Sequence, residues 1–391
     1  MNMRYLHYGL RALHPRNFFY LGKKTIHDLS NSHFSAEKNS THIDAAMQWL
    51  CRAQDVHEDG GVAALYSLFD GWKPSYIETT GYIISTFFNH YHLTKNIDFK
   101  KRAIRMADFE LKMQLKNGGF EGGRGKGNAV TFNTGQVLFG FCRAYKESNY
   151  GQYKDAAIRA ADLLIDSQED SGRFVKNLYM DCVHTYNTRT AWALLKVHDI
   201  TKKERYKEGA IKNIEWALTQ QQENGWFANN WFYPGQEPLV HTIAYSIRGI
   251  LESGLYLKNE NFITAALKSA TALAHLQRKD GSLAGSFDEN WKSSVSWSCL
   301  TGNSQMSIIW QKLDIHEKND TLMAAAIKSN HYMKTVQDRS SRNPGINGAI
   351  PGAYPIYGWY APFSYINWGT KFFVDALMLE EHPHLADKID S

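Results

Sequence analysis

The chain has 391 residues, of which 43% are hydrophobic, 13% aromatic and 21% charged. This composition excludes wholesale disorder, because disordered chains are poor in aromatic residues and rich in charge. The net charge of +5, from 44 Lys and Arg against 39 Asp and Glu, is too small to indicate a nucleic-acid partner.

The first 41 residues are basic and aromatic, with neither a long apolar core nor the small-residue cleavage site of a secretory signal. We expect them to form an N-terminal arm, residues 1–41, packed on the following domain. Peripheral contact with an anionic membrane surface is the alternative. The longest apolar stretch, Tyr82 to Phe88, is too short to span a bilayer.

Four dispersed cysteines match no zinc signature and are typical of buried thiols in a reducing compartment: Cys51, Cys142, Cys182 and Cys299. We therefore expect a cytoplasmic protein, with association at a membrane surface left open. Neither a metal site nor a cofactor is expected.

A helical segment that ends in Gln, followed by a polar turn and glycine, occurs six times along the chain. The glutamines recur about every 55 residues, at Gln54, Gln114, Gln168, Gln222, Gln277 and Gln337. Each glycine turn leads through a loop into a second helix, whose apolar residues recur at three and four positions. Each repeat is therefore predicted to be a pair of helices.

Six helix pairs predict an all-α fold, an (α/α)6 toroid over residues 42–391, in which inner and outer helices alternate around a central cleft. An open solenoid would end in polar capping repeats. The last repeat is instead among the most aromatic, with residues such as Trp359 and Trp368, which favours a closed ring.

The repeated Gln-x-x-x-Gly-Gly turn resembles the terpenoid cyclase and prenyltransferase-like toroids, over roughly residues 42–381. The DxDD and DDxxD acid motifs of cyclases are absent, as is the zinc set of lanthionine cyclases. Asp181 and Cys182 are adjacent, not spaced as in zinc-binding prenyltransferases. The resemblance therefore concerns architecture only.

The other large group of such toroids acts on carbohydrates and includes glycoside hydrolases, polysaccharide lyases and uronate C5-epimerases. Cyclase-like chains without the cyclase acids also resemble polysaccharide-biosynthesis proteins. The resemblance implies a carbohydrate-active enzyme of polysaccharide metabolism or biosynthesis, with a saccharide partner, expected to contain uronate, in the central cleft. Lyase or epimerase chemistry is favoured over the alternative, which is hydrolysis with Glu78 and a second acid as the catalytic pair.

In a toroid the inner helices begin at the cleft, and we expect the second helix of each pair to be the inner one. Asn and Thr at these starts are ordinary N-caps, whereas Glu and His are not. Glu78 is therefore a candidate general acid or base, with compensation of the helix dipole as the alternative. His241 and Tyr245 share a helix face.

The segment Asp181 to Arg189 is the densest polar cluster of the chain. Uronate lyases and epimerases need a base for the C5 proton, a group that neutralises the carboxylate, and an acid. The candidate catalytic residues are therefore Glu78, Asp181, His184, Tyr186, Arg189, His241 and Tyr245.

Sugar rings stack on aromatic faces, and amides and guanidinium groups hydrogen-bond their hydroxyls. The candidate substrate-binding residues are Asn133, Asn187, Trp231, Trp297, Trp359, Tyr360, Tyr365, Trp368 and Arg124. Arg124 lies in the glycine-rich loop Gly118 to Ala129, which lacks the pattern of a phosphate loop.

Two other functions remain open. One is a non-catalytic glycan-binding or assembly protein of polysaccharide biosynthesis, which predicts an aromatic cleft without a carboxylate or His near the sugar. The other is an isoprenoid enzyme, which predicts a deep, closed and apolar cavity.

Overall fold

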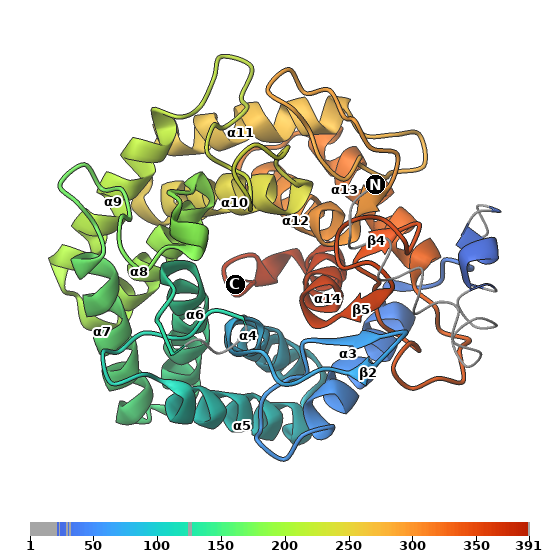
Figure 1. Cartoon of the computed structure of the whole chain (residues 1–391), viewed down its shortest axis with the longest axis horizontal. Coiled ribbons are helices and arrows are strands. Elements are labelled where there is room, and N and C mark those ends of the chain that lie inside the picture. The colour runs from blue at the N-terminus through green and yellow to red at the C-terminus, as the bar shows by residue number, and fades with distance from the viewer. Residues whose placement is uncertain (1–21, 23, 29, 31–32, 124–126, 390–391) are drawn as a thin grey trace.

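The computed structural model describes residues 22, 24–28, 30, 33–123 and 127–389. Helices form two concentric layers around a centre (Figure 1). The outer layer contains α3 (Asn39–Asp55), α5 (Ile97–Met113), α7 (Gly151–Asp166), α9 (Glu204–Leu218), α11 (Glu260–His275) and α13 (Asp320–Val336). The inner layer contains α4 (Ile77–Thr94), α6 (Thr131–Ser148), α8 (Thr188–Thr201), α10 (Val240–Leu257), α12 (Leu300–His316) and α14 (Asn367–Glu381).

The second helix of each pair is the inner one, as predicted. Each inner helix packs against the next, and α14 returns to contact both α4 and α3. The inner helices are buried on most of their surface, and α6, α10 and α12 bury nearly every residue of their first three turns. The outer helices bury one stripe only, which matches the polar character of their sequences.

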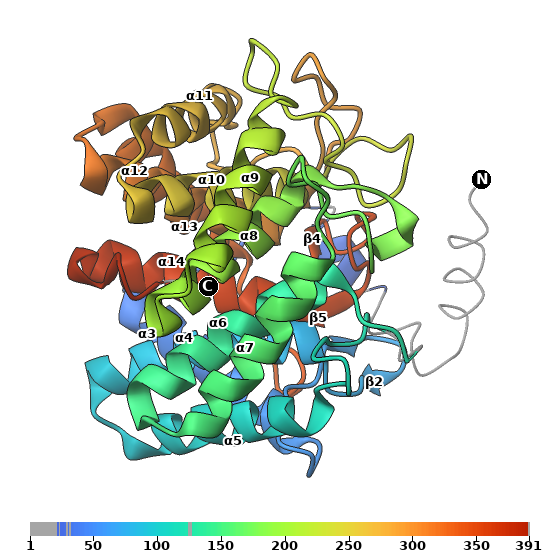
Figure 2. The same cartoon turned by 90° about the vertical axis from the view of Figure 1, so that its left-hand side faces the viewer.

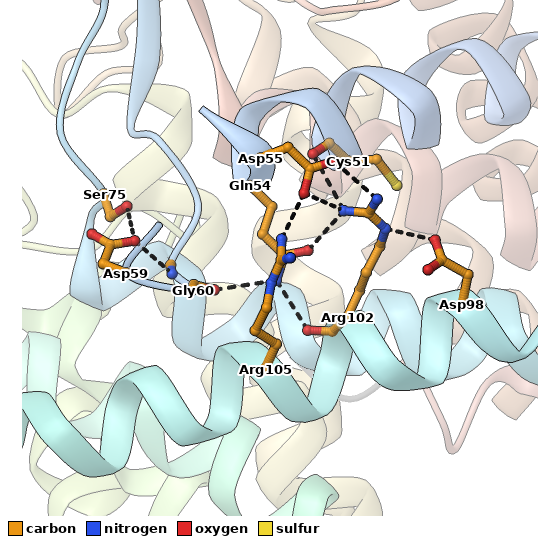
Figure 3. A network of polar contacts seen from close by, with 10 residues as sticks. Cys51, Gln54, Asp55, Asp59, Gly60, Ser75, Asp98, Arg102 and Arg105 are labelled. Atoms are coloured by element: carbon orange, nitrogen blue, oxygen red, sulfur yellow. Dashed lines mark hydrogen bonds and ion pairs between the residues drawn. The ribbon is translucent and has the colours of Figure 1, made fainter. Parts of the chain in front are cut away.

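The repeated glutamines brace neighbouring outer helices. Gln54 Nε2 donates to the carbonyl oxygen of Gly60 in its own glycine turn (3.1 Å) and to that of Arg102 on α5 (3.0 Å), as Figure 3 shows. Gln114, Gln168 and Gln277 make the same pair of bonds. Gln337 at the end of α13 bonds Gly348 (2.7 Å) and His42 on α3 (3.1 Å). The last brace therefore joins the last repeat to the first.

The fourth brace is Gln221, and the assignment of Gln222 was wrong by one residue. Gln221 Nε2 donates to the carbonyl oxygen of Ala265 on α11 (2.8 Å) and to Ser269 Oγ (2.9 Å). The Ser269 hydroxyl in turn donates to the Gly225 carbonyl oxygen (2.5 Å), while Gln222 is exposed. Adjacent glutamines past the end of α9 fit the spacing equally well, and only the backbone direction decides which one points inward.

We expect Gln221→Ala to lower the free energy of unfolding by about 1–3 kcal/mol, because buried backbone and hydroxyl groups lose their donor. Gln222→Ala, next to it in sequence, should change stability by less than about 0.5 kcal/mol. Urea unfolding of both variants measures the difference. Equal effects at the two positions would contradict the assignment.

The polar residues near the inner-helix starts do not cap the helices, contrary to the usual role of Thr and Asn there. In α4, α6, α12 and α14 the fourth residue of the helix instead accepts the backbone N–H that follows the glycine turn. Thr80 Oγ1 accepts from Val62 (3.0 Å) and Thr134 Oγ1 from Phe120 (3.0 Å). The equivalent residues of α12 and α14 are Asn303 and Thr370. These bonds hold the cleft loops against the inner layer.

Short strands join the first and last repeats at the loop end of the ring, which Figure 2 shows from the side. Strand β1 (Leu65–Ser67) lies between β2 (Gly71–Trp72) and β5 (Ser364–Ile366), both antiparallel to it. A second antiparallel pair is β3 (Ser298–Cys299) with β4 (Ala353–Tyr354). Short 3-10 turns are η1 (Tyr179–Asp181), η2 (Thr185–Asn187) and η3 (Pro383–Leu385).

The chain end enters the centre of the ring (Figure 1). Arg248 donates to the carbonyl oxygen of Ile389 (2.6 Å), and Asn89 and Arg143 donate to that of Lys388 (2.9 and 3.2 Å). Ile389 is buried. The C-terminal segment is therefore fixed to three inner helices.

The described residues of the N-terminal arm contact the last repeat. Asp28 Oδ2 accepts the backbone N–H of Ile356 (2.9 Å), and the Phe34 N–H donates to the Thr335 carbonyl oxygen (2.8 Å). Residues 1–21, on which membrane contact would depend, lie outside the described part. In that part no helix has the length and apolarity needed to cross a membrane, and the four cysteines are free thiols.

Candidate active site

A cavity of about 340 Å³ lies at the starts of α4, α6, α10 and α14. Its size is at the lower end of the range typical of small-molecule sites, about 300–1,000 Å³. Eight of the candidate residues line it: Glu78, Asn133, Tyr186, His241, Tyr245, Trp359, Tyr360 and Trp368. The inner-helix starts and the loops before them thus bring together residues from the first, second, third, fourth and last repeats.

Glu78 is the second residue of α4 and the cavity's acid–base candidate. Its Oε2 accepts hydrogen bonds from the Tyr76 hydroxyl (2.8 Å) and from Asn133 Nδ2 (3.0 Å). Burial raises its pKa to about 7, although these two bonds and the charge of Arg189 oppose the rise. Both protonation states are therefore populated near neutral pH, which suits a group that transfers protons.

His241, the second residue of α10, is a neutral imidazole. Its Nδ1 lies 2.9 Å from Gln305 Oε1, and burial lowers its pKa to about 3. Because an amide oxygen only accepts, Nδ1 carries the proton and Nε2 is left as an acceptor. The ring packs on Tyr245, with centroids 4.3 Å apart. His241 is thus suited to accept a hydrogen bond from a ligand hydroxyl and not to carry charge.

Tyr245 remains protonated at physiological pH. Burial, followed by the charge of Glu78, raises its pKa above the usual range, and Arg189 opposes the rise. The side chain is 1% exposed and lines the cavity. It can therefore donate a proton or a hydrogen bond to a group bound beside it.

The aromatic rim comes from the last repeat. Trp359, Tyr360 and Trp368 all line the cavity, and Trp368 Nε1 donates to the Tyr360 hydroxyl (2.8 Å). The Tyr360 ring also lies 5.3 Å from His241. The hydrogen bond from Trp368 to Tyr360 orients these two rings, so that a ligand meets a fixed aromatic surface.

Six further aromatic residues of the cavity were missed: Tyr76, Tyr82, Phe132, Tyr179, Phe232 and Tyr233. The acid–base candidates were sought mainly at helix starts, whereas Tyr179, Phe232 and Tyr233 lie in the loops before α8 and α10. The hydroxyls of Tyr179 and Tyr233 are 3.3 Å apart. One signal was available, since Tyr76 lies two residues before Glu78.

Three polar candidates of the Asp181–Arg189 segment lie outside the cavity. Asp181 is exposed in η1, where Met180 and Asp181 adopt left-handed φ values of 57° and 53°. His184 is buried, with Nε2 3.0 Å from the Tyr179 carbonyl oxygen and its ring stacked on Tyr186 at 4.5 Å. Asn187 is buried in η2. The turns separate residues that a continuous helix start would have grouped.

The other aromatic candidates also lie elsewhere. Trp231 borders a separate surface depression with Cys182 and Pro234. The Trp297 ring packs so closely on Gly285 that a Cβ there would lie 2.2 Å from it. Tyr365 is buried in β5 opposite Tyr66. Arg124 lies outside the described residues.

Arg189 lies beneath the cavity floor and does not line it. The side chain is fully buried, and its Nε donates to Gln136 Oε1 (2.6 Å). The guanidinium lies 5.0 Å and 5.7 Å from the ring centroids of Tyr245 and Tyr82, both of which line the cavity. Its two terminal nitrogens have no hydrogen-bond partner among the described residues. Its positive charge therefore lies behind the rings of Tyr245 and Tyr82 and reaches Glu78 without direct contact.

Replacing Arg189 with Met should raise the pKa of Glu78 further, because the charge that favours the carboxylate is removed. The pH profile of activity should shift to alkaline pH. Arg173→Met, at an exposed arginine paired with Glu169, is the control. A lower rate with an unchanged pH profile would mean that Arg189 contributes packing only.

The described residues contain no group of three or more His, Cys, Asp or Glu that could hold a metal ion.

No family model and no curated protein matches this chain. Solved structures do. An unsaturated glucuronyl hydrolase specific for heparin is 15% identical, with 88% of this chain and 98% of that chain covered and a TM-score of 0.71. Cellobiose 2-epimerase from Bacillus thermoamylovorans is 12% identical (92% and 98% covered, TM-score 0.69). A polysaccharide lyase is 13% identical (89% and 98% covered, TM-score 0.65).

The chain has the fold of these proteins. The predicted (α/α)6 toroid is thereby confirmed. At such low identity the likeness extends to the fold and not to the chemistry, which has to be argued from the cavity.

Proposed function

We propose that the chain is an enzyme that binds a uronate-containing saccharide in the cavity and transfers the C5 proton through Glu78, as a lyase or a C5-epimerase. The observation that carries the proposal is one carboxyl group with a pKa of about 7 inside an aromatic cavity. The fold likeness to a glucuronyl hydrolase, an epimerase and a lyase supports the substrate class.

The number of acids favours proton abstraction over hydrolysis. Glycoside hydrolysis generally uses two carboxyl groups, one as acid and one as nucleophile or base. Among the described residues that line the cavity, Glu78 is the one carboxylate. Abstraction of a C5 proton needs a single base, and a separate proton donor can be a tyrosine.

The step balances with groups present in the cavity. The Glu78 carboxylate takes the C5 proton, and the electron pair of the C–H bond moves toward the uronate carboxylate. In elimination, the C4–O bond then breaks, a C4=C5 double bond forms, and Tyr245 protonates the leaving oxygen. In epimerisation, a proton returns to C5 from the opposite face. Both Glu78 oxygen contacts fall on Oε2, so Oε1 is the oxygen that meets the substrate.

The polar lining argues against an isoprenoid substrate. Glu78, Asn133, His241 and several tyrosine hydroxyls border the cavity. An apolar chain would leave Glu78 Oε1 and His241 Nε2, for which the described residues supply no hydrogen-bond donor, facing apolar groups, which costs about 1–3 kcal/mol for each. A sugar has hydroxyls to satisfy them.

Incubation with a panel of uronate polysaccharides tests the proposal. Ultraviolet absorbance reports the unsaturated products of a lyase, and deuterium uptake at C5 from heavy water reports epimerisation. Release of reducing ends without either signal would replace the proposal with hydrolysis. Binding without any turnover would leave a non-catalytic glycan-binding protein.

A further inference from the structure

A groove of about 1120 Å³ adjoins the cavity and is much larger than it. The linings of the two share Tyr76, Gly123, Pro362 and Trp368, so the groove and the cavity lie against each other. The rings of Tyr76 and Trp368 stand at this shared boundary, with centroids 6.3 Å apart. The groove is therefore the nearest space for the part of a ligand that is too long for the cavity.

The walls of the groove come from fixed elements. Leu65 and Ser67 belong to β1, which pairs with β5 of the last repeat. Ile77 begins α4, and Phe109 and Met113 lie near the end of α5. The groove thus runs outward from the cavity, between the first repeat and the end of the second outer helix.

Its lining combines apolar and hydroxyl-bearing side chains. Leu65, Ile77, Phe109 and Met113 are apolar, and Met113 is 36% exposed. The serines Ser67, Ser75 and Ser364 border the same groove. Sugar rings present the same two kinds of surface, because their C–H faces are apolar and their edges carry hydroxyls.

The charges of the groove do not suit a polyanion. Its lining has three carboxylates, Asp59, Asp70 and Glu121, against two amines, Lys73 and Lys112. Lys73 is paired with Asp70 at 2.7 Å. Asp59 is held by Ser75 and by the Gly61 N–H, both at 2.9 Å. The described side chains that line the groove therefore carry a net negative formal charge, which disfavours an anionic chain.

We propose that this groove binds the sugar units next to the reacting one, and that these units are neutral. This inference rests on the proposed function for the unit in the cavity. It deepens that function by specifying a mixed saccharide, in which a uronate is flanked by uncharged sugars, over a continuous polyuronate or a sulfated chain.

Binding of oligosaccharides to the full chain carrying Glu78→Gln, which slows turnover, tests the proposal. The probes are neutral gluco-, manno- and xylo-oligosaccharides of two and six units, and galacturonate oligosaccharides of the same two lengths. Isothermal titration should show that at least one neutral hexasaccharide binds about tenfold more tightly than its disaccharide. The hexasaccharide of galacturonate should bind no more tightly than the galacturonate disaccharide.

Met113→Glu should abolish the increase in affinity from disaccharide to hexasaccharide, because it places a charge among the apolar residues of the groove. Binding of disaccharides in the cavity should be unchanged. Ile327→Glu, at an apolar residue 49% exposed on α13, is the matched control and should keep the gain. The proposal would be overturned if the anionic chain bound more tightly with length, or if no neutral chain did.

The outcomes separate this proposal from the proposed function. If short uronate substrates are turned over but affinity does not increase with chain length, the proposed function is retained and the proposal for the groove is rejected. Tight binding of a neutral hexasaccharide that Met113→Glu weakens, without turnover of any uronate by the unmodified chain, would do the reverse.

Discussion

Glu78→Gln should lower turnover by about 100- to 10,000-fold, the usual contribution of a general acid or base. The Gln oxygen can still accept hydrogen bonds from Tyr76 and Asn133, so the side chain should keep its position. Steady-state kinetics on the best substrate of the uronate panel measures the loss. Asp181→Asn, at an exposed carboxylate outside the cavity, is the matched control and should keep full activity.

The pH dependence gives a second readout of the same group. If Glu78 is the base, its active form is the carboxylate, so activity should rise with pH through about 7 and then level off. The residual activity of Glu78→Gln should lack this limb. A wild-type profile that instead falls through pH 7 would assign Glu78 the role of acid.

The stability of the same variant shows that the loss is not caused by unfolding. The folded-state pKa of Glu78, about 7, lies above the ordinary glutamate value of 4.5. The folded state therefore binds more protons than the unfolded state between these values, and this carboxyl lowers stability as pH rises. Glu78→Gln removes the carboxyl group and with it this loss of stability. The free energy of unfolding of the variant at pH 8 should therefore not be lower than that of the wild type. Chemical denaturation at pH 5 and pH 8 checks the sign.

The ring could be predicted from the sequence because its braces are local. Gln54 reaches the Gly60 turn only six residues away, so Gln and Gly appear at a nearly fixed spacing in every repeat. Side-chain direction at a helix end is not encoded in that spacing, which is why Gln222 was chosen over Gln221.

Apart from the rim residues Trp359 and Tyr360, the cavity could be predicted where a helix start itself supplies the residue. Glu78 and His241 are both second residues of inner helices, and both line the cavity. Before α8 the chain instead forms two short 3-10 turns, which turn His184 behind Tyr186 and leave Asp181 at the surface. The loops that carry Tyr179 and Phe232 are placed by tertiary contacts, which the sequence pattern does not record.

Tyr245→Phe should lower turnover by about 100- to 10,000-fold if this hydroxyl is the proton donor. The raised pKa of Tyr245 keeps it protonated across the range in which Glu78 titrates, so the two groups can hold opposite states at one pH. The ring remains in the variant, so packing on His241 is retained. Tyr153→Phe, which removes a hydroxyl bonded to Asp108 on the outer layer, is the control and should keep activity.

The residual reaction of Tyr245→Phe separates elimination from epimerisation. In elimination the missing proton is needed by the leaving oxygen, so a substrate with a nitrophenoxy leaving group should recover most of the lost rate. In epimerisation the missing proton is the one returned to the opposite face of C5. Glu78 alone would then exchange the C5 hydrogen with heavy water while the configuration is retained. Loss of turnover with neither rescue nor exchange would mean that Tyr245 binds the substrate and transfers no proton.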